Sequence, residues 1–248
     1  MLDEAKRSRL AKKIAESGAA SRREAERLIE AGRVKVDGTV INTPVFFVTN
    51  ENVITIDDKS INKASEKIIV WKFHKPSGVL TTKRDTKNRR TVFDCIPKID
   101  QRLIYIGRLD YNTEGLLLFT NSGDLARKME LPSIGLKRTY RARILGRLTD
   151  EQVQKLKKGV TVDGVKYGPI EVKFETPRDR QSANSWIQVT LSEGKNREIR
   201  KVMEHMSCKV NRLIRISYGG ITLGDLPRGA FVQLSDKEMQ EILKRISV

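Results

Sequence analysis

The chain has 248 residues, 38% of them hydrophobic, which is enough for one large or two unequal folded units with buried cores. Its 48 Lys and Arg against 31 Asp and Glu give a formal charge of +17, which indicates a polyanionic partner, with nucleic acid as the first candidate. No apolar run approaches the ~20 residues of a membrane-spanning helix, and the charged amino terminus lacks a secretory signal, so we expect a cytoplasmic protein without membrane association.

A first folded unit is predicted at residues 1–57. Apolar residues at helical spacing predict a short helix over 10–15. A capping box formed by Ser21 and Glu24 predicts the start of a second helix, which Gly32 ends. The segment RVKVDGTVI then alternates apolar residues around an Asp-Gly turn, which is typical of a β-hairpin.

The second predicted helix carries three arginines, Arg22, Arg23 and Arg27, away from its apolar stripe. They are candidates to bind RNA phosphates, although a solvated helix with Glu26 and Glu30 as salt partners explains the same charges. The segment LAKKIAESGAASRREAERLIEAGRVKVDG resembles the S4 RNA-binding domain. This resemblance implies that the first unit uses its helix pair to dock on structured RNA.

A polar segment at 58–67, DKSINKASEK, predicts a linker. Beyond it, residues 68–248 combine short strands such as IIVWKF, TYRARIL and SWIQVTL with helical stretches such as GDLARKME and GKNREIRKVMEHM. This irregular mixture predicts an α+β domain with a mainly antiparallel sheet. Five cations and no acid lie between Leu131 and Thr149, a run that is either a solvated strand face or a path for RNA.

The segment GRLDYNTEGLLLFTN, residues 107–121, is the candidate catalytic segment. A polar loop that contains Arg108 and Asp110 precedes an apolar strand over 116–119. A carboxylate beside a cation at the end of a rigid strand suits a nucleophile or a base. A turn aspartate that accepts hydrogen bonds from nearby backbone N–H groups explains the same spacing equally well.

Cysteine and histidine give no sign of a metal site. Cys95 and Cys208 lie far apart without neighbours at ligand spacing, which favours small buried side chains over a disulfide or zinc. His74 and His205 are too few and too distant for a metal cage. We therefore expect no metal, and chemistry that relies on carboxylates, tyrosines and cations.

The segment GRLDYNTEGLLLFTN resembles the signature of the S4-bearing ribosomal RNA pseudouridine synthases, and HKPSGVLTT, KRTYRARI and EGKNREIRKVMEH match the same family in the same order. The resemblance covers nearly the whole chain and implies a catalytic domain with a central cleft. It implies that Asp110 is the catalytic aspartate, Tyr140 the active-site tyrosine and Arg200 the cation that pairs with the aspartate.

The resemblance also implies a role for Arg108, which would enter the RNA where the target nucleotide leaves. Extruding that nucleotide costs roughly a few kcal/mol, which phosphate contacts would offset. Asn196 and Arg197 are further candidate RNA contacts. The implied reaction breaks the N1–C1′ bond of uridine and rejoins the uracil through C5 without loss of atoms or redox change, so no cofactor is expected. Asp110 then either attacks the sugar or assists formation of a glycal.

The expected partner is ribosomal RNA. The segments NREIRK and RLIRISYGGITLGDLPRGAF resemble the branch of the family that acts on large-subunit RNA, and a monomer is the default oligomeric state. Two rival functions remain: a non-catalytic RNA-binding or ribosome-assembly scaffold, and a hydrolase that uses Asp110. The scaffold has no need for the set Asp110, Tyr140 and Arg200, and the hydrolase lacks a second acid or a metal cluster.

Overall fold

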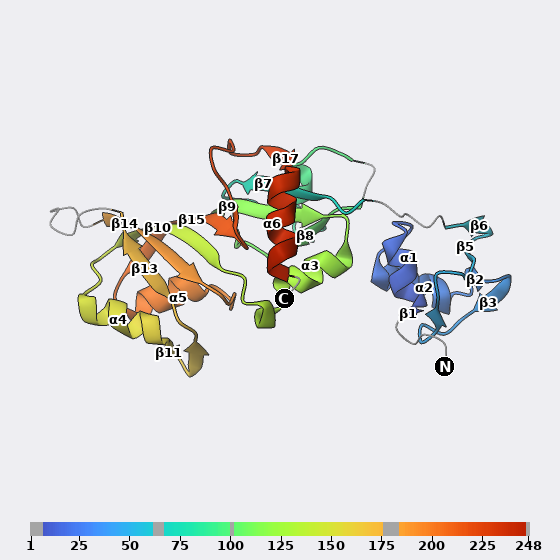
Figure 1. Cartoon of the computed structure of the whole chain (residues 1–248), viewed down its shortest axis with the longest axis horizontal. Coiled ribbons are helices and arrows are strands. Elements are labelled where there is room, and N and C mark those ends of the chain that lie inside the picture. The colour runs from blue at the N-terminus through green and yellow to red at the C-terminus, as the bar shows by residue number, and fades with distance from the viewer. Residues whose placement is uncertain (1–6, 62–66, 100–101, 176–183, 247–248) are drawn as a thin grey trace. The chain divides into compact units, whose positions relative to one another are not determined.

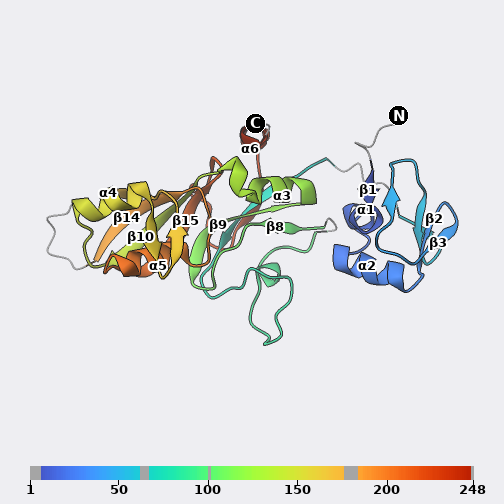
Figure 2. The same ribbon diagram turned by 90° about the horizontal axis from the view of Figure 1, so that it is seen from below.

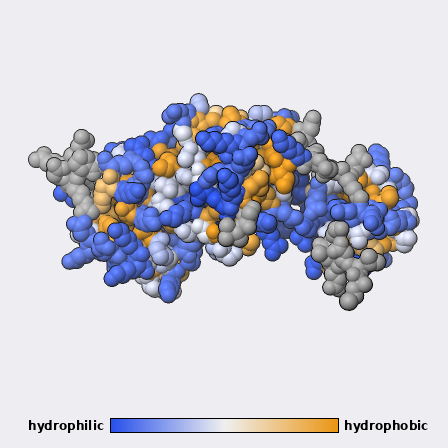
Figure 3. Space-filling model, viewed as in Figure 1, coloured by the Kyte–Doolittle hydropathy of each residue, from blue (hydrophilic) through white to orange (hydrophobic). Residues whose placement is uncertain are grey.

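The computed structural model describes residues 7–61, 67–99, 102–175 and 184–246. The chain divides into two compact units, residues 1–68 and 69–248, and each is described by itself. In Figure 3 hydrophilic residues cover much of the visible surface, in keeping with the many charged residues of the chain. Among the described residues no helix is both long and apolar enough to cross a membrane, and none of their His, Cys, Asp and Glu side chains form a group suited to a metal ion.

The first unit builds its core from two helices and short strands (Figure 1). Its second helix begins as the sequence predicts, because the Ser21 hydroxyl accepts a hydrogen bond from the Glu24 N–H at 3.2 Å. The predicted hairpin is also present, and its turn residues Asp37 and Gly38 both have positive φ, as a type I′ turn requires. The elements of this unit are β1 (Ser8–Arg9), α1 (Leu10–Glu16), α2 (Arg22–Glu30), β2 (Val34–Val36), β3 (Thr39–Ile41), β4 (Phe47–Val48), β5 (Ile54–Ile56) and β6 (Lys59–Ser60).

The first unit extends past the predicted boundary at residue 57. Lys59 and Ser60 form β6, which pairs antiparallel with β5, and Ile61 packs against the core of the unit. The linker was predicted from polar side chains, but strand pairing uses main-chain groups, so a polar segment can still form an edge strand. Residues 62–66 of the predicted linker lie outside the described residues.

The second unit has the predicted α+β architecture. Its sheet contains nine strands within the described residues, in the order β13-β14-β10-β15-β9-β7-β17, with β16 paired to β15 and β8 to β9. All pairs are antiparallel except β15 with β9. The strands are β7 (Val70–Lys75), β8 (Ile104–Ile106), β9 (Thr113–Thr120), β10 (Arg138–Leu145), β13 (Glu171–Phe174), β14 (Asn184–Leu191), β15 (Lys209–Tyr218), β16 (Ile221–Thr222) and β17 (Phe231–Gln233), and a separate hairpin is formed by β11 (Val160–Val162) and β12 (Val165–Tyr167).

Helices cover the sheet in two groups (Figure 1). The first group packs against β13 and β15, and the second against β8, β9 and β16. The helices of the first group are α4 (Asp150–Lys158) and α5 (Glu198–His205), and those of the second are α3 (Gly123–Glu130) and α6 (Asp236–Ile246). Two short 3-10 helices, η2 (Val92–Asp94) and η3 (Pro132–Ile134), lie in the connections.

Strand β9 is buried on both faces. Leu116 and Leu118 contribute to the core that contains α3 and α6, whereas Leu117 and Phe119 contribute to a core formed with the segment between β7 and β9. A strand covered on both sides requires an unbroken apolar run, which explains the sequence LLLF. The loop that precedes this strand is therefore attached to the most deeply buried part of the sheet.

Glycine is required where β9 meets β15. Gly115 has a φ of +105° and lies opposite Arg215 in the parallel pairing. A Cβ atom at this position would lie 2.7 Å from the Arg215 main-chain nitrogen and still closer to its carbonyl oxygen. The close approach of these two strands brings the loop before β9 next to the region of the chain that follows α5.

Candidate active site

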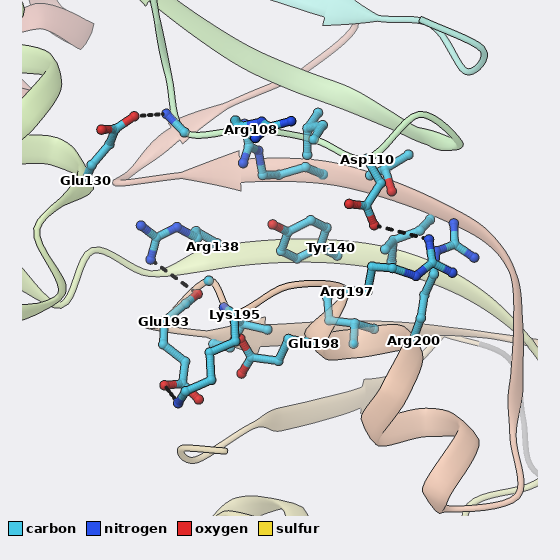
Figure 4. Close-up of a pocket in the computed structure, with 18 of the residues that line it drawn as sticks. Arg108, Asp110, Glu130, Arg138, Tyr140, Glu193, Lys195, Arg197, Glu198 and Arg200 are labelled. Atoms are coloured by element: carbon cyan, nitrogen blue, oxygen red, sulfur yellow. Dashed lines mark hydrogen bonds and ion pairs between the residues drawn. The ribbon is translucent and has the colours of Figure 1, made fainter. Parts of the chain in front are cut away.

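A cavity of about 380 Å³ opens in the second unit (Figure 4). Its lining comes from the loop between β8 and β9, from β10, from the turn after β14, from the start of α5 and from β15. The predicted residues Arg108, Asp110, Tyr140, Arg197 and Arg200 all line this cavity. Segments far apart in the sequence thus converge on one concave site, as is usual for a ligand site.

Asp110 lies in the loop just before β9. Its side chain is 33% exposed, and its Oδ2 lies 3.7 Å from an Nη of Arg197 (Figure 4). Its main-chain carbonyl accepts a hydrogen bond from the Thr113 N–H at 3.0 Å, which closes the turn into the strand. The turn is thus closed by main-chain groups, and Asp110 lines the cavity wall.

The pairing of Asp110 with Arg200 differs from the prediction. Among the described residues, the guanidinium within 4 Å of the Asp110 carboxylate belongs to Arg197. Arg200 instead donates to the carbonyl oxygens of Val210 at 2.8 Å and Asn112 at 3.4 Å. Burial lowers the pKa of Arg200, the charge of Arg197 adds to this lowering, and Asp110 opposes it. Arg200 therefore acts on Asp110 at longer range and also anchors the neighbouring residue of the loop.

Tyr140 occupies the middle of the cavity wall on β10. Strand alternation puts Tyr140 and Arg138 on the face that lines the cavity, while Arg141 lies exposed on the opposite face. Figure 4 shows the ring of Tyr140 between Arg138 and the Asp110–Arg197 pair. The ring also packs against two hydrophobic cores of the unit, so it is a firmly held aromatic surface suited to stacking.

The remaining predicted RNA contacts lie in three places: at the edge of the cavity, outside its lining, and on the first unit. Arg108 is exposed at the edge of the cavity, and Asn196 is exposed but outside the cavity lining. The three S4-type arginines, Arg22, Arg23 and Arg27, are exposed on α2, and Arg27 lies 3.6 Å from Glu24. The structure therefore presents all three arginines to solvent on one helix of the first unit.

The cations around β10 had two possible explanations, a solvated strand face or a path for RNA, and the structure places different residues of the run in each setting. Arg138 lines the cavity and donates to the Ser192 carbonyl at 2.8 Å. Arg141 pairs with Glu175 at 2.6 Å and Lys137 with Glu171 at 3.2 Å, so these two are partly neutralised on the solvated side. Only part of this run contributes to the candidate site.

Lys75 is a site residue that the sequence reasoning missed. It is fully buried, and its Nζ donates to the carbonyl oxygens of Pro76, Asp110, Tyr111 and Thr113 at 2.9 to 3.3 Å. Burial lowers the pKa of Lys75 to about 8, and Asp110 is among the charges that oppose the lowering. One ammonium group therefore holds the whole turn that carries Asp110.

Arg215 is a second missed residue. It is 1% exposed, lines the cavity, and donates from Nε to the Leu116 carbonyl at 2.7 Å. Its guanidinium also lies over the Tyr218 ring, 5.0 Å from the centroid. One of its terminal nitrogens is buried with no hydrogen-bond partner in the described part of the chain, so a bound ligand can supply one.

Glu198, at the start of α5, is the third missed residue. It is 4% exposed and lines the cavity, with one carboxyl oxygen accepting from the Lys195 N–H at 2.9 Å and the other unpartnered among the described residues. Burial, followed by the nearby Glu193 carboxylate, raises the pKa of Glu198 to about 7. This carboxyl group is therefore divided between protonated and ionised forms at neutral pH.

The site offers a carboxylate, a set of cations and an aromatic ring around a cavity large enough for a small ligand. A carboxylate at the wall of such a cavity can act as a nucleophile. The surrounding cations suit a ligand that carries phosphate groups, and the tyrosine ring suits a planar base. This combination fits a nucleotide better than an uncharged metabolite.

Comparisons with known proteins agree with this chemistry. The family model described as RNA pseudouridylate synthase matches residues 69–205, and the S4 domain model matches residues 8–54. An uncharacterized RNA pseudouridine synthase of Rickettsia felis is 45% identical over 233 residues, which cover 94% of this chain and 99% of that protein. Ribosomal large subunit pseudouridine synthase B of Escherichia coli O157:H7 is 41% identical, over 91% of this chain and 79% of that protein.

A solved structure supports the same fold. A crystal structure of a pseudouridylate synthase matches with a TM-score of 0.67 at 21% identity, covering 94% of this chain and 99% of that chain. The family resemblance seen in the sequence and the predicted α+β fold are thereby confirmed. The chain belongs to the RNA pseudouridylate synthase family and carries an S4 domain in front of its catalytic domain.

Proposed function

We propose that this protein converts a specific uridine of large-subunit ribosomal RNA to pseudouridine. The similarity to the large-subunit enzymes of Escherichia coli and Yersinia pestis, at 41% and 40% identity, supports ribosomal RNA as the substrate. The observation that carries the proposal is the Asp110 carboxylate, partly exposed in the cavity, 3.7 Å from Arg197 and beside Tyr140.

In the proposed mechanism Asp110 is the catalytic residue. Its carboxylate either attacks C1′ of the flipped uridine or assists formation of a glycal, and in both routes the C1′–N1 bond breaks. The freed uracil rotates, a C1′–C5 bond forms, and the proton leaves C5 while N1 becomes protonated. Every atom of the substrate is retained, so the reaction is balanced without a cofactor.

The neighbouring residues have supporting roles in this mechanism. Arg197 supplies the nearest positive charge to Asp110, and Arg200 fixes the adjacent Asn112 carbonyl while contributing a more distant charge. Tyr140 stacks on the uracil and keeps it in place while it rotates. These roles require the carboxylate to be ionised and the base to remain bound between the two bond changes.

Binding of the RNA is assigned to residues at the edge of the cavity and in the S4 domain. Arg108 fills the place that the flipped uridine leaves in the RNA, and Asn196 is an additional exposed contact near the start of α5. Arg22, Arg23 and Arg27 bind phosphates of structured RNA from the S4 domain. We propose that the protein does this as a monomer, with the first unit serving RNA docking and the second unit serving the reaction.

The test is Asp110→Asn, which keeps the shape of the side chain and removes its charge. We expect near-normal folding and affinity for ribosomal RNA but no pseudouridine formation in single-turnover assays. Asp163→Asn, in the exposed turn between β11 and β12, makes the same change of charge away from the site and is the control. Pseudouridine formation at the wild-type rate by Asp110→Asn would show that the assigned role is wrong.

The target is tested separately by mapping pseudouridine in ribosomal RNA from cells that lack this protein. We expect one position of the large-subunit RNA to remain uridine and to regain the modification when the protein is restored. Loss of a small-subunit position instead would contradict the proposed target while leaving the proposed chemistry intact. Loss of no position would favour the scaffold function over the enzyme.

A further inference from the structure

A second run of positive charge in the second unit lies outside the residues that the proposed mechanism uses. Residues 81–91, which we call the cationic loop, follow β7 and lead into η2. Figure 2 shows this teal-to-green part of the chain projecting from the body of the second unit. The loop contains five cations and one acid, namely Lys83, Arg84, Lys87, Arg89 and Arg90 against Asp85.

The cationic loop is closed firmly at its base. The Leu80 N–H donates to the Arg90 carbonyl at 2.9 Å, and the Val92 N–H donates to the Leu80 carbonyl at 2.8 Å. Thr91 then caps η2, exchanging hydrogen bonds with Asp94. The two ends of the loop are therefore fixed side by side, so the cations between them are held in a limited region of space.

The single acid of the loop is turned inward. The Asp85 carboxylate accepts from the N–H groups of Lys87 and Arg89 at 3.0 and 2.9 Å and from the Arg89 guanidinium at 3.1 and 2.8 Å. Its side chain is only 8% exposed, and the Arg89 guanidinium holds its pKa well below the usual range. The acid is thus used to shape the loop, while Arg84 and Lys87 stay exposed.

The cationic loop is joined directly to the turn that carries Asp110. At its first residue, the Thr81 hydroxyl donates to the Leu109 carbonyl at 2.9 Å and accepts from the Leu109 N–H at 3.3 Å. Just before the loop, the Gly78 N–H donates to the Tyr111 carbonyl at 2.9 Å. The residues on both sides of Asp110 are therefore bonded to this segment, which ties the base of the loop to the turn at the active-site cavity.

A second cavity of about 310 Å³ adjoins the loop at Lys83. It is also lined by Arg102, Arg127 and the ring of Tyr105, and it shares Glu130 with the active-site cavity. Burial lowers the pKa of Lys83, and the charge of Arg102 lowers it further. Three cations against one carboxylate give this cavity a net positive charge, which suits an anion such as a phosphate group.

We propose that the cationic loop and the cavity at Lys83 bind backbone phosphates of the RNA next to the target uridine, and that Asp85 gives the loop its binding shape. The identity of the anion as RNA rests on the proposed function, whereas the phosphate-binding surface rests on the loop itself. Phosphate contacts of this kind position the RNA without reading its sequence, and they weaken as salt is added.

The test measures affinity for a transcript of large-subunit ribosomal RNA as a function of salt concentration. In the variant Arg84→Gln/Lys87→Gln we expect roughly tenfold weaker binding at moderate salt and a salt dependence reduced by a slope of about 1.5, as two lost phosphate contacts require. The matched control is Lys157→Gln/Lys158→Gln, which removes the same charge from the exposed end of α4. An equal loss in both variants, or no loss in the first, would overturn the proposal.

The variant Asp85→Asn distinguishes two explanations of RNA binding, a loop with a defined shape and a diffuse positive charge. This variant raises the net charge of the protein, so unspecific attraction alone would tighten RNA binding. A loop that needs Asp85 for its shape binds RNA more weakly instead, and that is the result we expect, with thermal unfolding measured alongside to establish that the domain is folded. Tighter binding by the folded variant would contradict the role of Asp85.

These binding measurements do not depend on turnover. If the wild-type protein binds the transcript through the loop but forms no pseudouridine, the proposed function fails and the phosphate-binding surface stands. If the protein forms pseudouridine and the loop variants bind normally, the surface fails and the proposed function stands.

Discussion

The Nζ atom of Lys75 donates a hydrogen bond to the main-chain carbonyl of Asp110 at 3.2 Å, from a position that is completely buried. The same ammonium bonds the carbonyls of Tyr111 and Thr113, so it spans the turn from the candidate nucleophile to the first residue of β9. A buried cation is costly unless its donors are satisfied, and here main-chain oxygens satisfy them. The position of the Asp110 carboxylate therefore depends on a residue that does not line the cavity.

Lys75→Met tests this dependence. We expect a loss of about 2 kcal/mol of stability, because buried carbonyls lose a donor, and a fall of at least about tenfold in the single-turnover rate, because the carboxylate is displaced. Lys72→Met is the control, since Lys72 lies on the same strand and its ammonium pairs with Glu238 on the α6 side. It should change stability slightly and leave the rate as it was. A wild-type rate in Lys75→Met would show that the turn keeps its shape without the ammonium.

Arg197→Gln and Arg200→Gln distinguish the two guanidinium groups near Asp110. Arg197→Gln should lower the single-turnover rate by about 10- to 100-fold with little change in stability, because it removes the counter-charge at 3.7 Å. Arg200→Gln should lower both the rate and the stability, the latter by about 1–2 kcal/mol, because the Val210 and Asn112 carbonyls lose their donor.

The control for both variants is Lys201→Gln, an exposed cation on the same helix. Combining Arg197→Gln with Asp110→Asn should slow the reaction no further than Asp110→Asn alone, because the guanidinium then has no charge to act on. If Arg197→Gln were fully active and Arg200→Gln were inactive but normally stable, the result would support the pairing of Asp110 with Arg200 that the sequence predicted.

Glu198→Gln tests the buried carboxyl group at the start of α5 by its effect on stability. The folded pKa of about 7 is above the ordinary value of 4.5, so between these values the folded protein binds more protons than the unfolded chain. The stability of the wild type should therefore fall as pH rises from 5 to 8, by on the order of 1–3 kcal/mol. Glu198→Gln should lose this part of the pH dependence, because its amide has no proton to release.

Urea unfolding at several pH values measures this effect, with Glu204→Gln on the exposed side of α5 as the control. In the described part of the chain two groups face Glu198, namely the Lys195 N–H and the Glu193 carboxylate. Glu193 in turn accepts hydrogen bonds from the Gly168 N–H and the Lys195 ammonium. Equal pH profiles for the wild type and Glu198→Gln would mean that Glu198 is ionised in the folded protein throughout this range.

The regular elements were largely predictable because their signals are local. The cap at Ser21, the Asp37-Gly38 turn and the apolar run of β9 each depend on a few consecutive residues, and all three are present as expected. The end of the first unit was harder to predict than residue 57 suggested. Lys59 and Ser60 pair with β5 through main-chain groups, so their side chains give no sign of the strand. The mainly antiparallel α+β sheet followed from the mixture of strands and helices.

The site was predictable only in part, for a different reason. Lys75 and Arg215 are buried cations, and nothing in the composition around them distinguishes a buried cation from a solvated one. For Lys75 the signal was strand alternation, which puts it on the face of Trp71 and Phe73 in β7. Which arginine lies nearest to Asp110 could be told only from the backbone. Arg197 has a φ of +52°, so α5 begins after it, later than the periodicity of the sequence suggested.

The parallel pairing of β9 with β15 also bears on how the protein folds. Leu213, Ile214 and Arg215 pair with Thr113, Glu114 and Gly115, residues about one hundred positions earlier in the chain. Pairings across such sequence separations form slowly, because a long loop must close before any contact compensates for its lost entropy. Asp110, Arg197 and Arg200 can therefore meet only when the carboxyl-terminal half has been synthesised and packed, so a partly made chain lacks the assembled cavity.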